Sequence, residues 1–158
     1  AGIWCISSTV QNEIDMKKIA LTMISLAAFA AALSADDRPM AFEKLPVAAK
    51  EYIQTNFPGE KTTMVTKDDD LIFADYTVML SNGVKLEFEH SGALTQISSP
   101  NGIPAELVPV SIRNYVQTHY PDAGYLDFEI GKRTYEVKLT NRMELKFNNN
   151  FHIIEVDD

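Results

Sequence analysis

Apolar residues recur at every fourth position in two segments that lie sixty-three residues apart. In chain order the two series are Leu45, Ala49, Ile53, Phe57 and Val108, Ile112, Val116, Tyr120. This spacing predicts one apolar face on each of two helices. The helices are expected to begin near Pro46 and Pro109 and to stop before Pro58 and Pro121, because proline is tolerated in a first helical turn but not in a helix interior.

Residues after each helix alternate between apolar and polar, which predicts strands. The inward positions of the first predicted hairpin are Tyr76, Val78, Leu80, Leu86 and Phe88. Its outward positions are Thr77, Met79, Lys85, Glu87 and Glu89. Between the strands, Asn82-Gly83 predicts a two-residue turn. A second hairpin with the weaker turn Asn141-Arg142 repeats the inward pattern at Tyr135, Val137, Leu139, Leu145 and Phe147.

One further strand is expected on each side of each hairpin. The predicted ranges are Lys61–Lys67 and Ala93–Ser98 in the first copy, and Tyr125–Ile130 and Phe151–Val156 in the second. Leu126, Phe128 and Ile130 alternate with polar residues in the third of these ranges. The turn-rich segment Ser98–Gly102 is expected to join the two copies.

The chain therefore contains an internal duplication. Residues 43–58 (EKLPVAAKEYIQTNFP) and 106–121 (ELVPVSIRNYVQTHYP) are identical at seven of sixteen positions, and residues 76–88 match residues 135–147 in the same order. Each copy is a helix followed by about four antiparallel strands. Because each strand has one inward face, the sequence predicts an α+β fold of two layers, with helices on one side of a sheet. The other side is left open or is covered by a partner.

The first thirty-five residues are expected to lie outside the folded domain. Met16-Lys17-Lys18 and the uncharged run Ile19–Leu33 have the layout of a signal peptide at residues 16–35. The run is shorter than the roughly 20 apolar residues that span a bilayer, which favours a cleaved signal over an anchor. Residues 1–15 are interpreted as a non-native upstream extension and residues 36–41 as a flexible lead-in. The domain is expected at 42–158, with repeat one at 42–98 and repeat two at 103–158.

Export predicts a periplasmic or secreted protein without membrane attachment after cleavage. The single cysteine, Cys5, precedes the signal, so the exported domain is expected to have no disulfide. The net charge of −8 repels phosphate backbones, and no nucleic-acid partner is expected.

These residues resemble the PepSY-like, β-lactamase-inhibitor-protein-like domains, which are secreted or periplasmic. In the first copy the resemblance rests on Leu45-Pro46, Phe57-Pro58, Tyr76, Val78, Leu80, Asn82-Gly83, Leu86, Phe88 and Gly92. The second copy departs from the pattern where Arg142 replaces the turn glycine and Phe151 stands opposite Gly92. The resemblance implies two tandem α-β-β-β-β repeats that form one continuous antiparallel sheet, with the helices on one face. The matching residues are core and turn positions, so no functional residue is carried over.

The sequence contains few residues in arrangements that support catalysis or metal binding. His90, His119 and His152 have no neighbours at metal-ligand spacing, and there is no nucleophile-elbow or phosphate-loop motif. The acidic run Lys67–Asp70 lacks the spacing of a calcium loop and is interpreted as a solvated turn. Glu87 and Glu89 share a predicted face with Lys85, which favours a solvated mixed-charge surface over a catalytic acid pair. We therefore expect no enzyme activity, no cofactor and no metal.

The outward sheet face is the candidate binding surface. Its predicted residues are Phe73, Asp75, Thr77, Met79, Lys85, Glu87 and Glu89. Exposed apolar residues rimmed by charge are typical of protein-binding surfaces. The preferred hypothesis is an exported, non-catalytic module that binds an envelope or extracellular protein or peptide, as an inhibitor or modulator. The alternative is a cell-envelope binder of a small ligand or of a cation such as Ca²⁺, through the acidic surface or a pocket between the copies.

Overall fold

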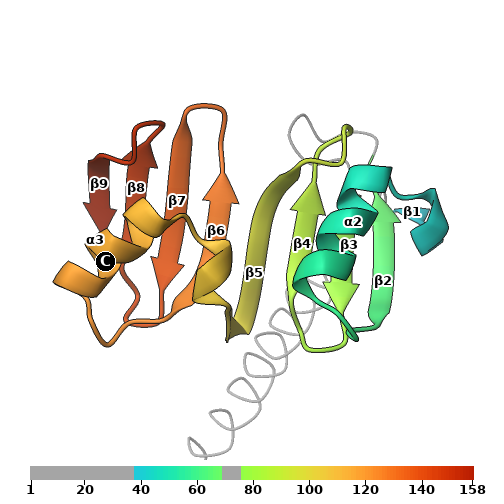
Figure 1. Ribbon diagram of the computed structural model, residues 1–158, viewed down its shortest axis with the longest axis horizontal. Coiled ribbons are helices and arrows are strands. Elements are labelled where there is room, and N and C mark those ends of the chain that lie inside the picture. Colours follow the sequence, from blue (N-terminus) through green and yellow to red (C-terminus); the bar gives the residue numbers. More distant parts are fainter. Residues whose placement is uncertain (1–37, 69–75) are drawn as a thin grey trace, which may run out of the picture. The chain divides into compact units, whose positions relative to one another are not determined.

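The described domain contains one nine-stranded antiparallel sheet, with its strands in sequence order (Figure 1). The structure is a computed structural model that describes residues 38–68 and 76–158. The first five strands are β1 (Arg38–Pro39), β2 (Thr62–Lys67), β3 (Tyr76–Leu80), β4 (Lys85–Phe88) and β5 (Leu94–Ile103). The other four are β6 (Tyr125–Ile130), β7 (Thr134–Leu139), β8 (Glu144–Asn148) and β9 (Ile153–Asp157).

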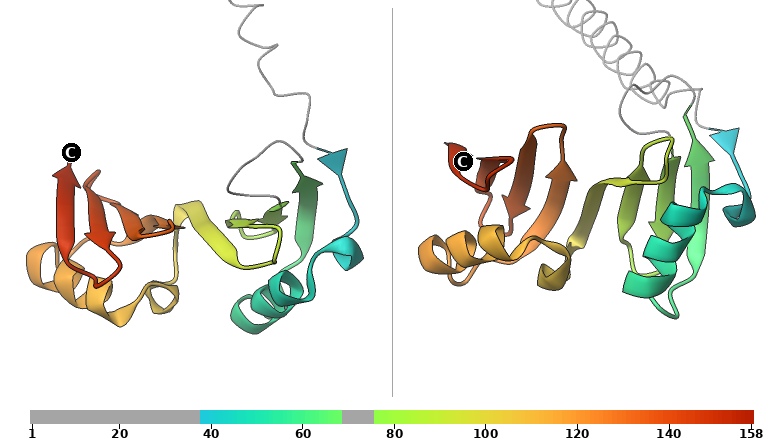
Figure 2. Two further views of the ribbon diagram at one scale, coloured as in Figure 1. Left: turned by 90° about the horizontal axis from the view of Figure 1, so that it is seen from above. Right: turned by 45° about the horizontal axis from the view of Figure 1, so that its top comes forward.

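Two helices lie on the same face of this sheet (Figures 1 and 2). They are α2 (Val47–Asn56) and α3 (Val110–His119), and a 3₁₀ turn precedes each, η2 (Phe42–Lys44) and η3 (Ala105–Leu107). The two tandem repeats and the continuous sheet are thus confirmed. Within the described ranges, no helix is both long enough and apolar enough to cross a membrane.

The predicted helix faces form the core together with the inward strand residues. All eight positions of the four-residue series are fully or largely buried, Tyr120 being the one packed against the edge of the core. In each repeat a helical tyrosine meets a strand phenylalanine nearly edge-on: the ring centroids are 6.0 Å apart for Tyr52–Phe88 and 5.4 Å apart for Tyr115–Phe147. Phe88 and Phe147 are fully buried, and complete burial of such a side chain contributes about 1.5–3 kcal/mol. The duplication therefore gives the two repeats equivalent cores.

The hairpin turns differ from the prediction of two-residue turns. Leu80 N–H donates to Val84 O (2.9 Å) and Gly83 N–H donates to Leu80 O (3.1 Å), which closes a three-residue loop. Asn82 stabilises it, since its side-chain oxygen accepts a hydrogen bond from Val84 N–H (3.1 Å). A three-residue loop of this kind needs a left-handed residue at its last position, and Gly83 has φ = 86°.

Repeat two builds its hairpin turns in the same way without glycine. Arg142 and Phe151, which stand in place of Gly83 and Gly92, have φ values of 74° and 60°. Arg142 N–H donates to Leu139 O (3.1 Å), as Gly83 does in repeat one. The two departures from the family pattern thus leave the turn geometry unchanged. They place Arg142 and Phe151 in the left-handed backbone region, which is strained for residues other than glycine.

Three predicted boundaries were wrong. The expected joint Ser98–Gly102 lies within β5, because Ser99 and Ile103 are buried and Ile103 pairs with Tyr125 of β6. Phe151 lies in the turn before β9, where its ring stacks on Tyr135 at 4.9 Å. Two residues of the expected lead-in, Arg38 and Pro39, pair with β2 as strand β1.

Candidate functional site

The sheet face opposite the helices carries two rows of side chains that run across the strands. The strand register defines the first row as Thr66, Thr77, Glu87, Gln96, Glu129, Glu136, Lys146 and Glu155. The second row is Met64, Met79, Lys85, Ser98, Asp127, Lys138, Glu144 and Asp157. All of these side chains except Thr66 are at least partly exposed. We call this surface the open face.

The structure brings four of the predicted site residues onto the open face. Thr77 and Met79 of β3 lie opposite Glu87 and Lys85 of β4, and the Lys85 ammonium forms an ion pair with the Glu87 carboxylate. Glu89 follows the end of β4, and its carboxylate accepts a hydrogen bond from the Ser91 hydroxyl at 2.5 Å. Phe73 and Asp75 lie outside the described residues. A binding role for this set stays a prediction.

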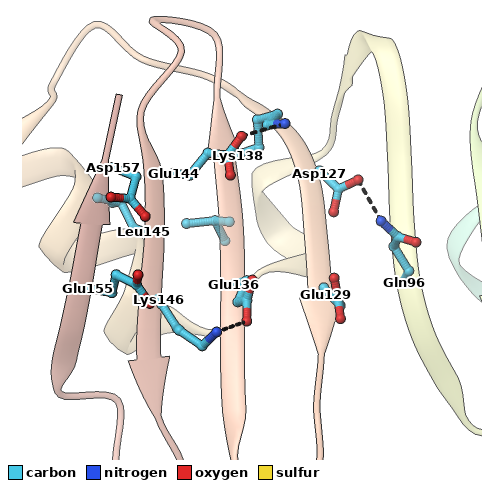
Figure 3. Close-up of a pocket in the computed structure, with 11 residues that line it drawn as sticks. Gln96, Asp127, Glu129, Glu136, Lys138, Glu144, Leu145, Lys146, Glu155 and Asp157 are labelled. Carbon is cyan, nitrogen blue, oxygen red and sulfur yellow. Dashed lines mark hydrogen bonds and ion pairs between the residues drawn. The ribbon is translucent and has the colours of Figure 1, made fainter. Parts of the chain in front are cut away.

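A shallow pocket of about 300 Å³ occupies the repeat-two half of the open face (Figure 3). Its polar lining comes from β5 to β9 and consists of Gln96, Asp127, Glu129, Glu136, Lys138, Glu144, Lys146, Glu155 and Asp157. Six of these side chains are carboxylates and two are lysines. We call this cavity the acidic pocket.

Part of the charge in the acidic pocket is already paired. The Lys138 ammonium lies 2.5 Å from the Glu144 carboxylate, and the Lys146 ammonium lies 2.6 Å from the Glu136 carboxylate. Gln96 Nε2 donates to Asp127 Oδ2 at 2.7 Å. The two lysines therefore neutralise two of the six acids, and the pocket keeps an excess of negative charge.

Burial, together with this excess of negative charge, raises the pKa of two carboxyl groups in the pocket. Burial is the main cause of the raised pKa of Asp127, and the Gln96 hydrogen bond partly opposes it. The pKa of Glu129 is also raised, first by burial and then by the neighbouring carboxylates of Glu136, Asp127 and Glu87. A positive charge placed in the pocket would relieve this repulsion.

A second, more apolar pocket of about 550 Å³ lies where the two repeats meet. Glu87, Glu89 and Leu94 line it from repeat one, and Glu129 and Ile130 line it from repeat two. The sequence hypothesis of a pocket between the copies therefore corresponds to a cavity that includes two of the predicted site residues.

The carboxylates do not form a ready metal site. Within the described ranges, no three histidine, cysteine, aspartate or glutamate side chains are grouped closely enough to hold a metal ion. The negative charge is instead spread along the rows, a distribution that suits a partner with several positive charges better than a single ion.

Sequence reasoning did not identify the acidic pocket. Its members come from five strands, and only the register between the strands brings Asp127 and Glu129 beside Lys138 and Glu136. The sequence signal that could have indicated the pocket was the set of outward positions in repeat two, aligned with those of repeat one.

The family comparison matches nearly the whole described domain. The sequence model described as "Putative beta-lactamase-inhibitor-like, PepSY-like" matches twice, over residues 34–96 and 74–155. None of the curated proteins matches the chain.

Three solved structures share the fold. A "putative calcium-regulated periplasmic protein" from Bacteroides thetaiotaomicron is 35% identical, with a TM-score of 0.74, and the match covers 78% of this chain and 98% of that one. A "putative periplasmic protein from DUF2874 family" from Bacteroides vulgatus is 40% identical (TM-score 0.71; 79% and 99% covered). Another Bacteroides vulgatus periplasmic protein, described as of unknown function, is 29% identical (TM-score 0.72; 77% and 99% covered).

These relatives agree with the expected location of the protein in the periplasm or outside the cell. Neither the family nor the similar structures indicate a catalytic class. The repeated match and the shared fold lead to one conclusion: the chain belongs to the PepSY-like family.

Proposed function

We propose that the protein is an exported, non-catalytic binding module that holds a protein or peptide of the cell envelope on its open face. The observation that carries this proposal is the pair of side-chain rows, which present partly exposed polar and charged groups across both repeats. Within the part of the chain that the structure describes, both helices lie on the opposite face of the sheet (Figure 2), which supports a binding role for the open face.

The composition of the open face supports a macromolecular partner. Met64 and Met79 lie opposite each other at the repeat-one end, and Met64 is 48% exposed. The acidic pocket lies at the repeat-two end. A surface with an apolar end and an acidic end can contact a protein through both burial and charge, which a small ion cannot do.

A pull-down from the envelope fraction tests the proposal. The bait is the protein obtained by expressing the full chain, beside a double variant of the open face, Met79→Asp/Lys85→Glu. We expect the wild-type protein to retain one partner and the variant to lose it. The matched control is Val47→Asp/Val110→Asp, which adds two charges at exposed positions of the helix side (64% and 58% exposed). Loss of the partner in the control alone would contradict the proposal.

Calcium binding in the acidic pocket is a second candidate. It is favoured by the raised pKa values of Asp127 and Glu129, since a cation would offset the repulsion that contributes to them. A similar structure is that of a protein described as a "putative calcium-regulated periplasmic protein". The side chains would have to move to surround an ion, because Ca²⁺ takes six to eight oxygen ligands.

Thermal unfolding distinguishes this candidate from the first. If Ca²⁺ binds the pocket, millimolar Ca²⁺ raises the Tm of the wild-type protein and not that of Asp127→Asn/Glu129→Gln. Mg²⁺ at the same concentration is the control for general screening of the negative charge. Equal effects of the two ions, or an equal effect on the variant, would contradict calcium binding at this site.

A further inference from the structure

The strand β9 is the repeat-two counterpart of β5, and β5 is paired with a neighbouring strand on both sides. The pairs β4–β5 and β8–β9 have the same register, including the irregularity near their ends, with every residue number shifted by 59. Gln96, Ile97 and Ser98 of β5 therefore correspond to Glu155, Val156 and Asp157 of β9. The outer edge of β5 pairs with β6, whereas no described strand pairs with the outer edge of β9 (Figure 1).

The difference is visible in burial. Ile97, which is covered by its neighbours on β4 and β6, is fully buried, whereas its counterpart Val156 is 45% exposed. The neighbouring Ile154 is 54% exposed. An edge strand also has backbone N–H and C=O groups that can pair with an added strand. Apolar surface thus coincides on one edge with backbone groups that pair with no strand in residues 38–68 and 76–158.

We propose that the outer edge of β9 is a docking site for an extended protein segment that alternates basic, apolar and basic side chains. The β5–β6 pair supplies the template. There Glu129, Phe128 and Asp127 of β6 lie opposite Gln96, Ile97 and Ser98. On β9 the neutral residues are replaced by Glu155 and Asp157, so an added strand needs positive side chains at the two flanking positions and an apolar one opposite Val156.

The same charges disfavour a second copy of this chain at the site. If two β9 strands paired antiparallel with Val156 opposite Val156 or Ile154 of the other copy, Glu155 would lie opposite Asp157 or opposite another Glu155. Like charges at directly opposed positions destabilise a sheet. The other edge of a second copy is also a poor partner, because β1 has only two residues and Pro39 has no N–H to donate.

The probe is a synthetic peptide with the sequence of β6, Tyr125–Ile130, that carries Asp127→Lys and Glu129→Lys. We expect this lysine peptide to bind the protein, obtained from expression of the full chain, and to slow hydrogen exchange of the β9 amides. The unaltered β6 peptide, with its two acids, should bind about ten-fold more weakly. A lysine peptide methylated at every backbone nitrogen keeps its charge but cannot donate the hydrogen bonds of a strand. It should also bind about ten-fold more weakly than the lysine peptide.

A charge-reversed protein completes the test. Glu155→Lys/Asp157→Lys should prefer the acidic β6 peptide over the lysine peptide. The matched variant Glu129→Lys/Glu136→Lys changes the acidic pocket and leaves the edge intact, so it should keep the original preference. Thermal unfolding of both variants checks that they fold, and the exchange measurement on the wild-type protein stands without them.

The docking proposal would be overturned by equal binding of the methylated peptide, by no binding of the lysine peptide at all, or by dimerisation of the protein through β9 in sedimentation experiments. The inference rests on the proposed function only in taking a protein segment as the partner. If the pocket variant alone lost the lysine peptide, the edge proposal would fail while binding on the open face would stand.

Discussion

Single residues at the turns show where the duplicated repeats tolerate strain. Arg142 has φ = 74° in a turn that repeat one builds with Gly83. A side chain in the left-handed region costs about 1 kcal/mol, whereas glycine adopts it freely. The repeat-two sequence therefore keeps a strained residue where the turn geometry requires glycine-like backbone angles.

Arg142→Gly is expected to increase the free energy of unfolding by about 0.5–1 kcal/mol, the strain relieved being partly offset by the greater entropy of glycine in the unfolded chain. Denaturant unfolding followed by circular dichroism measures the change. The reciprocal variant Gly83→Arg should lose stability. Equal and small effects of the two changes would show that the turns carry no strain.

Glu129 should make stability depend on pH. Its folded-state pKa lies above the ordinary value, so the folded protein holds a proton that the unfolded chain releases, and stability falls as pH rises through that window. Glu129→Gln removes this loss. The variant should be more stable than the wild-type protein at pH 7 and equally stable below pH about 4. Unfolding curves across that pH range provide the measurement, and a gain that grows toward low pH would contradict the assignment.

At the scale of elements, the helices were predictable because their signal is local. The four-residue spacing and the flanking prolines predicted α2 and α3, and both end directly before the C-cap residues Phe57 and Tyr120 that precede Pro58 and Pro121. Strand ends were harder. β5 runs through a proline-glycine segment because burial of Ser99 and Ile103 outweighs the local turn preference.

The helix–sheet core gives a prediction at this scale. Ile112 is fully buried at the position that Ala49 occupies in repeat one. Ile112→Ala should lower the free energy of unfolding by about 2–5 kcal/mol, since it leaves a cavity under α3. The converse change Ala49→Ile should cost about 1–3 kcal/mol by overpacking, because Ala49 is also fully buried and α2 already approaches Gly92 closely. A smaller loss in both would show that the core is loosely packed.

At the scale of the whole molecule, the duplication predicted the architecture and the sequence could not predict the acidic pocket. Alternation along β6 places Asp127 and Glu129 on the other face of the sheet from Phe128. It does not predict which residues of the neighbouring strand lie beside them. A bulge between Tyr125 and Asp127 sets that register. The open face was thus predictable as a surface, whereas its charge distribution depends on long-range pairing that leaves no local pattern.

We propose that the open face is the surface on which this exported protein binds its partner. The most direct test is photo-crosslinking from single positions in envelope preparations. A photo-reactive amino acid is placed on the open face, at Met79 or Lys138, or on the exposed helix side, at Glu51 or Asn114. If the partner binds the open face, both open-face positions give one crosslinked partner and the helix positions give none. Crosslinks from the helix positions, with none from the open face, would contradict it.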